Sequence, residues 1–334
     1  MKELYQLKID AYSHIIPPKY RDALYKVAPE LYDQQVVHWP PLFDLDARFR
    51  IMDKYEPIRQ VLTLGRVAVE HLAGPEKAQE LAKLANDEMA ELVYKYPDRF
   101  VAALTTLAMN NFDAALEEID RTIKDMRFRG VYLHTPVDEK PLDIPEFMPL
   151  YEKMAEYDLP IVIHPMRKPT HPDYMTEDVS KYWIYQLFGW PFDTTSAMAR
   201  LVGSGIMEKY PNLKVLTHHC GGMVSFYAER IKQFTQLMEF RGVGLGLKKP
   251  AIDYYQMFYA DTAIYGNPSA LMCGYAFFGA DHMLFGADFP LGDTERGNRN
   301  YRQTINAIEQ MDISDEERKK IYEDNARKLM KLPI

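Results

Sequence analysis

The stretch Leu159-Pro160-Ile161-Val162-Ile163-His164-Pro165 decides the fold, because it joins an almost continuous apolar run to a polar residue near its end. A strand in a parallel sheet is covered on both faces and is therefore apolar along its whole length. Further runs of this kind recur along the chain, and each interval leaves room for a helix. They are Leu7–Tyr12, Ile58–Gly65, Phe100–Ala108, Gly130–Thr135, Leu213–Cys220, Phe258–Ile264 and Met283–Phe289. The repeated strand and helix pattern predicts an α/β protein with the (β/α)₈ TIM barrel fold.

The segments between these strands carry helical patterns. Glu76–Tyr96, Phe112–Met126 and Phe147–Tyr157 place apolar residues at helical spacing, with charged residues on the other side. The whole chain of 334 residues suits a single barrel domain, because such barrels span roughly 200 to more than 400 residues. Two connections, residues 15–55 and 166–198, are longer than a barrel needs and leave the carboxyl ends of strands, where barrel active sites lie. We expect both connections to form lids over the site.

The composition excludes several classes of partner. The net charge is −8 and the basic residues are scattered, so we expect no nucleic acid partner and no binding to an anionic membrane surface. The first residues, MKELYQLKID, lack the apolar run of a secretory signal, and no stretch reaches the ~20 apolar residues of a membrane span. Cys220 and Cys273 are too few for a disulfide framework. We therefore expect a cytoplasmic protein that packing alone stabilises.

Several predicted strands finish with a residue that can bind a metal ion. His14 follows the first strand, His164 ends the fifth, His218 and His219 end the sixth, and Asp288 ends the eighth. Closing a barrel brings the carboxyl ends of its strands to one mouth. A single buried histidine is more often a hydrogen-bonded core residue, but ligand-type residues at four strand ends favour a metal site. Zn²⁺ is our first choice for these nitrogen and oxygen ligands, and Mn²⁺ and Fe²⁺ are the alternatives.

The alternation of side chains along a strand separates the two adjacent histidines. Val215, Thr217 and His219 share one face of the sixth strand, whereas Leu216 and His218 share the other. We predict that His219 points into the barrel. There it either binds the metal directly or lies beside it and exchanges a proton with bound water, as a general base does.

Longer motifs connect these positions. The run Met207-Glu208-Lys209-Tyr210-Pro211-Asn212-Leu213-Lys214 leads into His219-Cys220-Gly221-Gly222, and the chain later contains Gly286-Ala287-Asp288-Phe289-Pro290. Shorter motifs are Ile9-Asp10-Ala11-Tyr12-Ser13-His14, His164-Pro165, Lys181-Tyr182-Trp183, Thr194-Thr195 and Glu229-Arg230-Ile231. With these motifs, nearly the whole chain resembles the amidohydrolase superfamily. Within it, the chain is similar to the amidohydrolase-2 type family of 2-amino-3-carboxymuconate-6-semialdehyde decarboxylase and related aromatic acid decarboxylases.

The resemblance implies a metal-dependent, non-oxidative decarboxylase of a small unsaturated or aromatic carboxylic acid, and it implies a homodimer. By the same resemblance, His14, His164 and Asp288 hold the metal, and His219 activates the metal-bound water. Arg230 matches an arginine that reaches the substrate carboxylate across the dimer interface. Without the resemblance, Arg230 would be interpreted as a solvated helix residue or as part of a structural ion pair.

The chain departs from this family at two places. The family opens with His-x-His or Glu-x-His, whereas Tyr12 stands at the first ligand position here. A neutral phenol with a pKa of about 10 is a poor metal ligand, so we expect Tyr12 to donate a hydrogen bond to substrate or to fill space rather than to ionise on the metal. The second substrate-binding arginine of the family is missing from the first lid, where His38, Arg48 and Arg50 are the nearby cationic candidates. This difference predicts a different natural substrate.

The pocket around the metal is predicted from strand ends and from the second lid. His134 ends the fourth strand and Asp261 lies on the seventh, where each either lines the pocket or satisfies backbone groups. Trp183 belongs to a group of aromatic residues in the second lid, which either contacts substrate or packs the lid onto the barrel or another subunit. Together with the resemblance, which implies the role of Arg230, these positions lead us to expect that Arg230, Tyr12, His134 and Trp183 bind substrate.

We expect a decarboxylation in which an acid supplied by His219 or Asp288 protonates the carbon that bears the carboxylate, while the metal binds the carboxylate or a neighbouring hydroxyl. No organic cofactor is expected, because the glycine-rich residues 242–246 follow a helical segment instead of opening one. One alternative is a hydrolase in which metal-bound hydroxide attacks a lactone, an ester or a cyclic amide. Another is a degenerate barrel that binds a small ligand without turnover.

Overall fold

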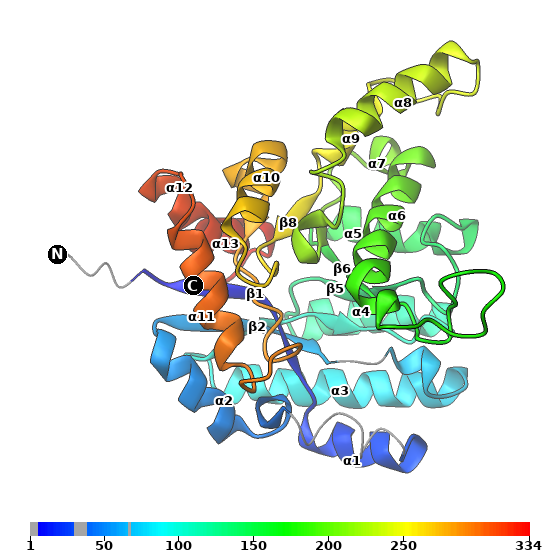
Figure 1. Cartoon of the computed structure of the whole chain (residues 1–334). Helices are drawn as coiled ribbons and strands as arrows, with labels where there is room; N and C mark the ends of the chain where they lie inside the picture. Colours follow the sequence, from blue (N-terminus) through cyan, green and yellow to red (C-terminus); the bar gives the residue numbers. More distant parts are fainter. Residues whose placement is uncertain (1–5, 30–38, 66–67) are drawn as a thin grey trace.

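The chain forms a barrel of parallel strands surrounded by helices (Figure 1). The computed structural model describes residues 6–29, 39–65 and 68–334. The strands are β1 (Lys8–Ile15), β2 (Ile58–Leu64), β3 (Phe100–Ala103), β4 (Thr105–Thr106), β5 (Val131–Thr135), β6 (Ile161–Pro165), β7 (Val215–Thr217), β8 (Tyr259–Asp261) and β9 (Met283–Leu284). β3 and β4 are two parts of one predicted strand, interrupted at Leu104. Each predicted run therefore contains a strand, and the predicted fold is confirmed.

Hydrogen bonds close the barrel where the two regular sheets end. One sheet contains β1 to β3 and the other contains β4 to β9, and all neighbours within them are parallel. The amide of Leu104, between β3 and β4, donates to a carbonyl of β2 at 2.9 Å. At the other edge, the amides of Ala11 and His14 donate to the carbonyls of Phe285 and Phe289 at 2.9 and 2.8 Å. The first strand thus pairs with the segment that follows β9.

Apolar side chains from successive strands fill the barrel interior. They are Ile9, Val61, Tyr132, Val162, Leu216 and Leu284, which are 0–3% exposed and pack in one cluster. The side chains that alternate with them, such as Val131, Ile161 and Val215, belong to the layer between the strands and the helices. The next inward-facing positions lie two residues further along each strand. They fall at the carboxyl ends of the strands, where polar residues begin.

Helices cover the outside of the barrel. α3 (Pro75–Lys95), α4 (Phe112–Asp125) and α5 (Met148–Tyr157) begin and end within one residue of the predicted helices. Pro75 occupies the first turn of α3, where its missing N–H has no partner to lose. The later helices are α6 (Trp190–Gly203), α7 (Ile206–Lys209), α8 (Ala228–Phe240), α9 (Ala251–Tyr255), α10 (Pro268–Phe278), α11 (Asn298–Glu309), α12 (Asp315–Lys319) and α13 (Asn325–Leu329). Among the described residues, no helix combines the length and the apolar character that crossing a bilayer requires.

The first predicted lid, residues 15–55, is tied to the barrel by a buried arginine. It contains the helices α1 (Pro18–Val27) and α2 (Leu45–Met52). Arg48 of α2 is 0% exposed and donates hydrogen bonds to the side chains of Gln60 and Ser13 and to two backbone carbonyls. Its guanidinium therefore supports the barrel wall and does not serve as the second substrate arginine. Arg50 is exposed, and His38 lies outside the described residues.

The second predicted lid, residues 166–198, overlaps the start of a helix on the outside of the barrel. A π-helical turn (Tyr185–Gly189) continues directly into α6. Ala197 and Leu201 of α6 are buried in the layer beneath the helices, so α6 is one of the helices that cover the barrel. Residues 190–198 therefore belong to this covering helix, which begins within the aromatic part of the predicted lid sequence. The role of residues 166–189 as a lid stays a prediction.

Candidate metal centre

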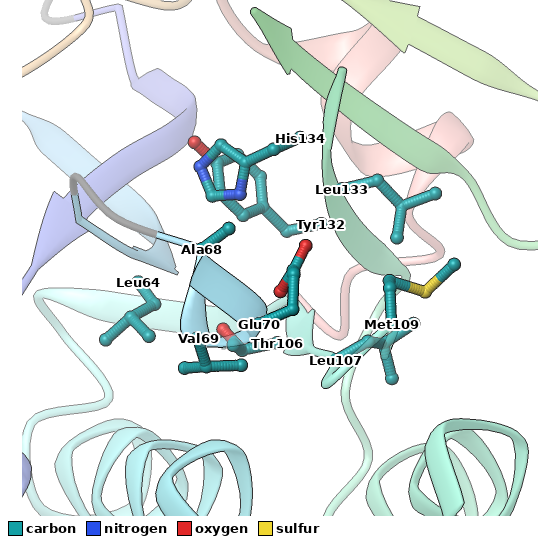
Figure 2. A pocket seen from close by; sticks show the side chains of 10 residues that line it. All are labelled: Leu64, Ala68, Val69, Glu70, Thr106, Leu107, Met109, Tyr132, Leu133 and His134. Atoms are coloured by element: carbon teal, nitrogen blue, oxygen red, sulfur yellow. The ribbon is translucent and has the colours of Figure 1, made fainter. Parts of the chain in front are cut away.

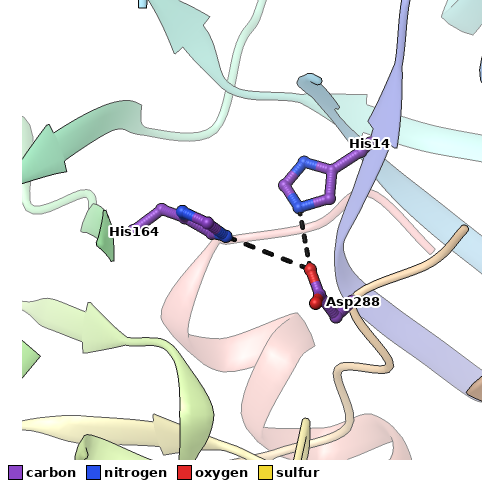
Figure 3. Close-up of side chains that lie close together, drawn as sticks. All are labelled: His14, His164 and Asp288. Atoms are coloured by element: carbon purple, nitrogen blue, oxygen red, sulfur yellow. Dashed lines mark hydrogen bonds and ion pairs between the residues drawn. The ribbon is translucent and has the colours of Figure 1, made fainter. Parts of the chain in front are cut away.

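Three side chains from distant parts of the chain converge at the mouth of the barrel (Figure 3). His14 lies in β1, His164 lies in β6, and Asp288 lies in the segment after β9. Nε2 of His14 is 3.1 Å from Oδ1 of Asp288, and Nε2 of His164 is 4.0 Å from the same oxygen. The three ligand atoms lie within 4.8 Å of one another, and the residues are only 1–5% exposed. The structure thus brings together the three residues that the strand ends single out.

The second nitrogen of each histidine is already engaged. Nδ1 of His164 donates to the carbonyl of Pro165 at 2.7 Å, which leaves the lone pair of Nε2 free. Nδ1 of His14 lies 3.1 Å from the hydroxyl of Thr63. Such bonds fix the orientation of metal-binding histidines. Two imidazole nitrogens and one carboxylate, held in this way, fit a divalent transition metal.

The protonation states of the cluster also suit a metal ion. Burial alone would raise the pKa of Asp288, but the imidazoles of His14 and His219 outweigh it and hold the pKa well below its usual range. Burial, together with the neighbouring His14, lowers the pKa of His164 well below its ordinary value. Asp288 is therefore an anion and His164 is neutral at neutral pH. These are the forms that bind metals.

His219 reaches the cluster through a turn and not through strand alternation. The inward face of β7 carries Leu216 and then His218, so the face predicted for His219 is wrong. The strand ends before this pair, and His219 and Cys220 both have a φ of 54°. This left-handed turn places Nε2 of His219 3.8 Å from Oδ2 of Asp288. His219 therefore lies beside the predicted ligands because of this turn, which the alternation of side chains along a strand cannot predict.

Asp261, at the end of β8, holds this turn in place. Its carboxylate accepts the amide N–H groups of His219 and Cys220 at 3.0 Å each and that of Ala263 at 2.9 Å. The hydroxyl of Tyr12 donates to the same carboxylate at 2.5 Å. These hydrogen bonds compensate for burying the carboxylate and for two residues in a left-handed conformation. Of the two roles expected for Asp261, the structure shows the one that satisfies backbone groups.

Tyr12 helps Asp261 to hold the turn that carries His219. Its side chain is 0% exposed, and its hydroxyl is directed to Asp261. Burial and the charge of Asp261 raise the pKa of Tyr12 well above its ordinary value, so the phenol is neutral. At the position where the family pattern has a metal ligand, this chain therefore has a hydrogen-bond donor to the carboxylate that orients His219.

Replacing Tyr12 by phenylalanine is expected to leave the metal stoichiometry unchanged, because the hydroxyl is bonded to Asp261 and not to the metal ligands. Elemental analysis of the purified variant by mass spectrometry measures this. Tyr20→Phe, which removes the hydroxyl of another buried tyrosine in α1, is the matched control. Loss of metal from Tyr12→Phe alone would mean that the phenol is a ligand.

His218 points into the barrel, whereas strand alternation was predicted to turn it outward. It is 0% exposed, and its ring centre lies 3.5 Å from that of Tyr12 and 4.5 Å from that of His164. Neither of its nitrogens has a hydrogen-bond partner among the described residues. Burial, with the neighbouring His164, lowers its pKa well below the ordinary value, so the ring is neutral. The signal that could have found it is Leu216, which continues the apolar interior pattern of β7.

His134 lines a small cavity that the metal ligands do not line (Figure 2). The cavity has a volume of about 10 Å³ and is also bordered by Glu70, Thr106 and Tyr132. A space of this size holds about one water molecule. Burial lowers the pKa of His134 to about 3 and raises the pKa of Glu70 to about 7. The cavity is too small for a substrate, and contact of His134 with substrate stays a prediction.

Trp190, the first residue of α6, lies against the predicted ligands. Its ring centre is 5.5 Å from that of His164 and 6.4 Å from that of His219, and its indole N–H donates to the carbonyl of Arg167 at 3.1 Å. Trp183, in contrast, is 66% exposed and lies beside Tyr185. The sequence offers several aromatic residues here as candidates for substrate contact. Which of them points toward the predicted ligands depends on where α6 begins, and the sequence pattern does not give that position. Substrate binding by Trp183 stays a prediction.

The structure places Arg230 on the surface of the chain. It is on α8, a helix with no buried residue that projects from the body of the molecule (Figure 1). The residue is exposed, and its guanidinium carbon lies 4.4 Å from the ring centre of Phe234. Contact of Arg230 with substrate across a dimer interface stays a prediction.

Comparisons with known proteins show which family the chain resembles. The model of the amidohydrolase family (Amidohydro_2) matches residues 9–332. A gamma-resorcylate decarboxylase from a Polaromonas species is 29% identical, and the match covers 88% of this chain and 91% of that protein. The 2-amino-3-carboxymuconate-6-semialdehyde decarboxylase of Dictyostelium discoideum is 27% identical, with 76% of this chain and 69% of that protein covered.

A solved structure is similar over almost the whole fold. It is the dihydroxybenzoic acid decarboxylase of a Polaromonas species, crystallised with bound manganese and the inhibitor 2-nitroresorcinol. Its TM-score is 0.81 at 27% sequence identity, and the match covers 98% of this chain and 97% of that one. The architecture of a metal-binding barrel enzyme is therefore shared from end to end.

Proposed function

Because this chain belongs to the amidohydrolase family, we propose that it is a metal-dependent, non-oxidative decarboxylase of a small unsaturated or aromatic carboxylic acid. The observation that carries the proposal is the convergence of His14, His164 and Asp288 beside His219 at the barrel mouth. The match of 88% of the chain to a gamma-resorcylate decarboxylase supports this reaction over other chemistry on the same fold. The enzyme would be a carbon–carbon lyase.

Nε2 of His14, Nε2 of His164 and the carboxylate of Asp288 are the groups that would hold the metal. When bound, a divalent cation supplies Lewis-acid chemistry, which draws electron density from a substrate carboxylate or a neighbouring hydroxyl. The manganese in the related Polaromonas structure makes Mn²⁺ the first metal to test, ahead of the Zn²⁺ that the ligand types suggested. Nitrogen and oxygen ligands of this kind suit both ions.

We assign the proton transfer to His219. Its backbone is fixed by Asp261, and its Nε2 faces the Asp288 carboxylate at 3.8 Å. From there the imidazole delivers a proton to the substrate carbon that bears the carboxylate. A C–H bond forms, and the C–C bond to the carboxylate then breaks. Its electron pair restores the conjugation of the substrate as CO₂ leaves. Trp190 covers the adjacent imidazole of His164 and helps to exclude water from this region.

Purified protein supplied with Mn²⁺ is expected to release one CO₂ for each gamma-resorcylate or related hydroxybenzoate consumed, with the corresponding phenol as the other product. Removing the metal with a chelator should abolish CO₂ release, and adding Mn²⁺ or Zn²⁺ back should restore it. Full activity after exhaustive chelation would contradict the metal role. A product that keeps the carboxyl carbon would instead identify a hydrolase of a lactone, an ester or a cyclic amide, and a bound metal without turnover of any acid would identify a ligand-binding barrel.

We also propose a homodimer in the cytoplasm, in which α8 packs against the partner subunit and Arg230 contacts the substrate there. The support is the apolar surface on and beside α8, where Phe226 is 76%, Phe234 48% and Phe240 89% exposed. Such a surface is unusual for a monomer. The two cysteines are free, which agrees with a reducing compartment. Sedimentation equilibrium tests the assembly, and a monomer at micromolar concentration would contradict it.

A further inference from the structure

A second, larger cavity adjoins the metal centre. It has a volume of about 220 Å³ and lies where the segments after β8 and β9 meet the beginning of α11. Its lining includes Tyr265, Asp288, Arg299, Asn300 and Gln303. A cavity of roughly 150 Å³ already admits a benzene ring. This space is therefore large enough for part of a small aromatic acid.

The cavity shares one wall with the metal centre. Asp288, a predicted metal ligand, lines the cavity, and Tyr265 donates a hydrogen bond from its hydroxyl to Oδ2 of Asp288 at 3.2 Å. The ring of Tyr265 is stacked beside that of His219, with centres 6.2 Å apart and planes 17° apart. The cavity and the predicted metal centre therefore share Asp288, with Tyr265 in contact with both.

Two polar groups that line the cavity make no hydrogen bond with a described residue. The exposed guanidinium of Arg299 makes neither a hydrogen bond nor an ion pair within the described residues, although its charge acts on Glu295, whereas Arg302, one turn further along α11, pairs with Glu295 at 2.7 Å. Asn300 is 7% exposed, and its Oδ1 has no hydrogen-bond partner in the part of the chain that the structure describes. A buried acceptor without a partner costs stability unless a ligand or water supplies a donor.

The orientation of Asn300 is fixed by its other atom. Nδ2 donates to the carbonyls of Ala287 and Leu291 at 3.0 and 2.9 Å. Because only the NH₂ group can donate to two carbonyls, Oδ1 is the atom left over, and it can accept a hydrogen bond but not donate one. The cavity thus offers a cation at Arg299 and a neutral acceptor at Asn300.

Asp293 also lines the cavity, but its carboxylate is already used. It accepts the backbone N–H groups of Glu295, Gly297, Arg299 and Asn300 at 2.6–3.2 Å. These bonds hold the start of α11 and so fix the backbone of the two residues that carry the free groups. Asp293 acts as a support for the cavity wall, and the charge that remains available to a ligand there is that of Arg299.

We propose that this cavity is the subsite for a second anionic group of the substrate, bound by Arg299, with a substrate hydroxyl donated to Oδ1 of Asn300. The inference rests on the proposed function, since it takes the substrate to be a carboxylic acid held at the metal. It adds that the acid is a dicarboxylate or an equivalent dianion. Arg299 then supplies, from α11 of the same chain, the cationic contact that is missing from the first lid.

Isothermal titration of the Mn²⁺-loaded protein with benzoate and with isophthalate tests this subsite. The native protein is expected to bind isophthalate at least about tenfold more tightly than benzoate, since a hydrogen-bonded charge pair is worth about 1.5–3 kcal/mol. Arg299→Gln should weaken isophthalate binding by about ten- to hundredfold and leave benzoate binding within about threefold. Arg302→Gln removes the same charge from the same helix, outside the cavity lining, and should change the affinity for neither acid.

Equal affinity of the native protein for both acids would overturn the subsite. An equal loss of affinity for benzoate and isophthalate in Arg299→Gln would also overturn it. Thermal melting of each variant identifies a loss of binding that comes from unfolding. The result is separate from the test of the reaction, because binding is measured without turnover. A protein that releases no CO₂ but still discriminates the two acids through Arg299 would refute the decarboxylase proposal and retain the subsite.

Discussion

Replacing His164 by alanine is expected to remove the metal and the activity together. His164 is one of the three predicted ligands, so its loss leaves one imidazole and one carboxylate, too few to hold a transition metal tightly. Loss of an outer partner of a metal ligand already lowers metal affinity by about 10–100-fold, so loss of a ligand should cost more than about 100-fold. CO₂ release should fall by at least about 1000-fold, because the Lewis acid contributes several kcal/mol. Elemental analysis and a CO₂ assay measure the two effects.

The matched control is His171→Ala, which removes an exposed histidine from the second lid. This variant should keep both the metal and the activity, because His171 is not one of the three predicted ligands. Circular dichroism should give the same helical signal for both variants. A His164→Ala protein that purifies with undiminished metal would contradict the ligand assignment, whatever its activity.

Replacing Arg48 by alanine is expected to destabilise the fold by about 3–5 kcal/mol, the cost of breaking a buried charged network. Its guanidinium donates at 2.8–2.9 Å to Oε1 of Gln60, to Oγ of Ser13 and to the carbonyls of His14 and Pro41. Burial lowers the pKa of Arg48 to about 10, so the group is still charged at neutral pH. Its removal leaves four buried acceptors without a donor. Chemical unfolding monitored by tryptophan fluorescence measures the effect.

Arg50→Ala is the control for this variant, because Arg50 lies on the same helix and is exposed. Surface substitutions of this kind change stability by no more than about 0.5 kcal/mol. Both proteins should be compared with the metal removed, so that a change in metal affinity does not enter the result. Equal stability of the two variants would contradict the structural role of Arg48.

The fold and the convergence of His14, His164 and Asp288 could be predicted because both depend on local sequence patterns. Parallel strands are apolar along their length, so runs such as Leu159–Pro165 stand out, and β6 lies inside that run. The carboxyl ends of all barrel strands meet at one mouth. His164 and Asp288 therefore meet as a consequence of topology alone, without any knowledge of the loops between them.

The details that were not predicted depend on contacts between distant residues. Alternation gives the direction of a side chain only while the strand continues, and β7 ends at Thr217. The turn that follows is held by Asp261, more than 40 residues further along the chain. The direction of His219 is therefore set by a carboxylate that no local pattern connects with it, and His218 takes the inward position instead. Arg48 is a similar case, because its helical pattern does not reveal its partners on β1 and β2.

The joint at which the barrel closes has a consequence for the whole protein. His14 and Asp288 are 274 residues apart in the chain, yet their neighbours Ala11 and Phe285 are hydrogen-bonded where the first strand meets the last segment. A cation held by this pair would link the first strand of the barrel to the last segment. Its binding energy then adds to the stability of the folded barrel by mass action. A shortage of the metal would therefore lower the stability of the folded barrel, and so shorten the lifetime of the protein in addition to lowering its activity.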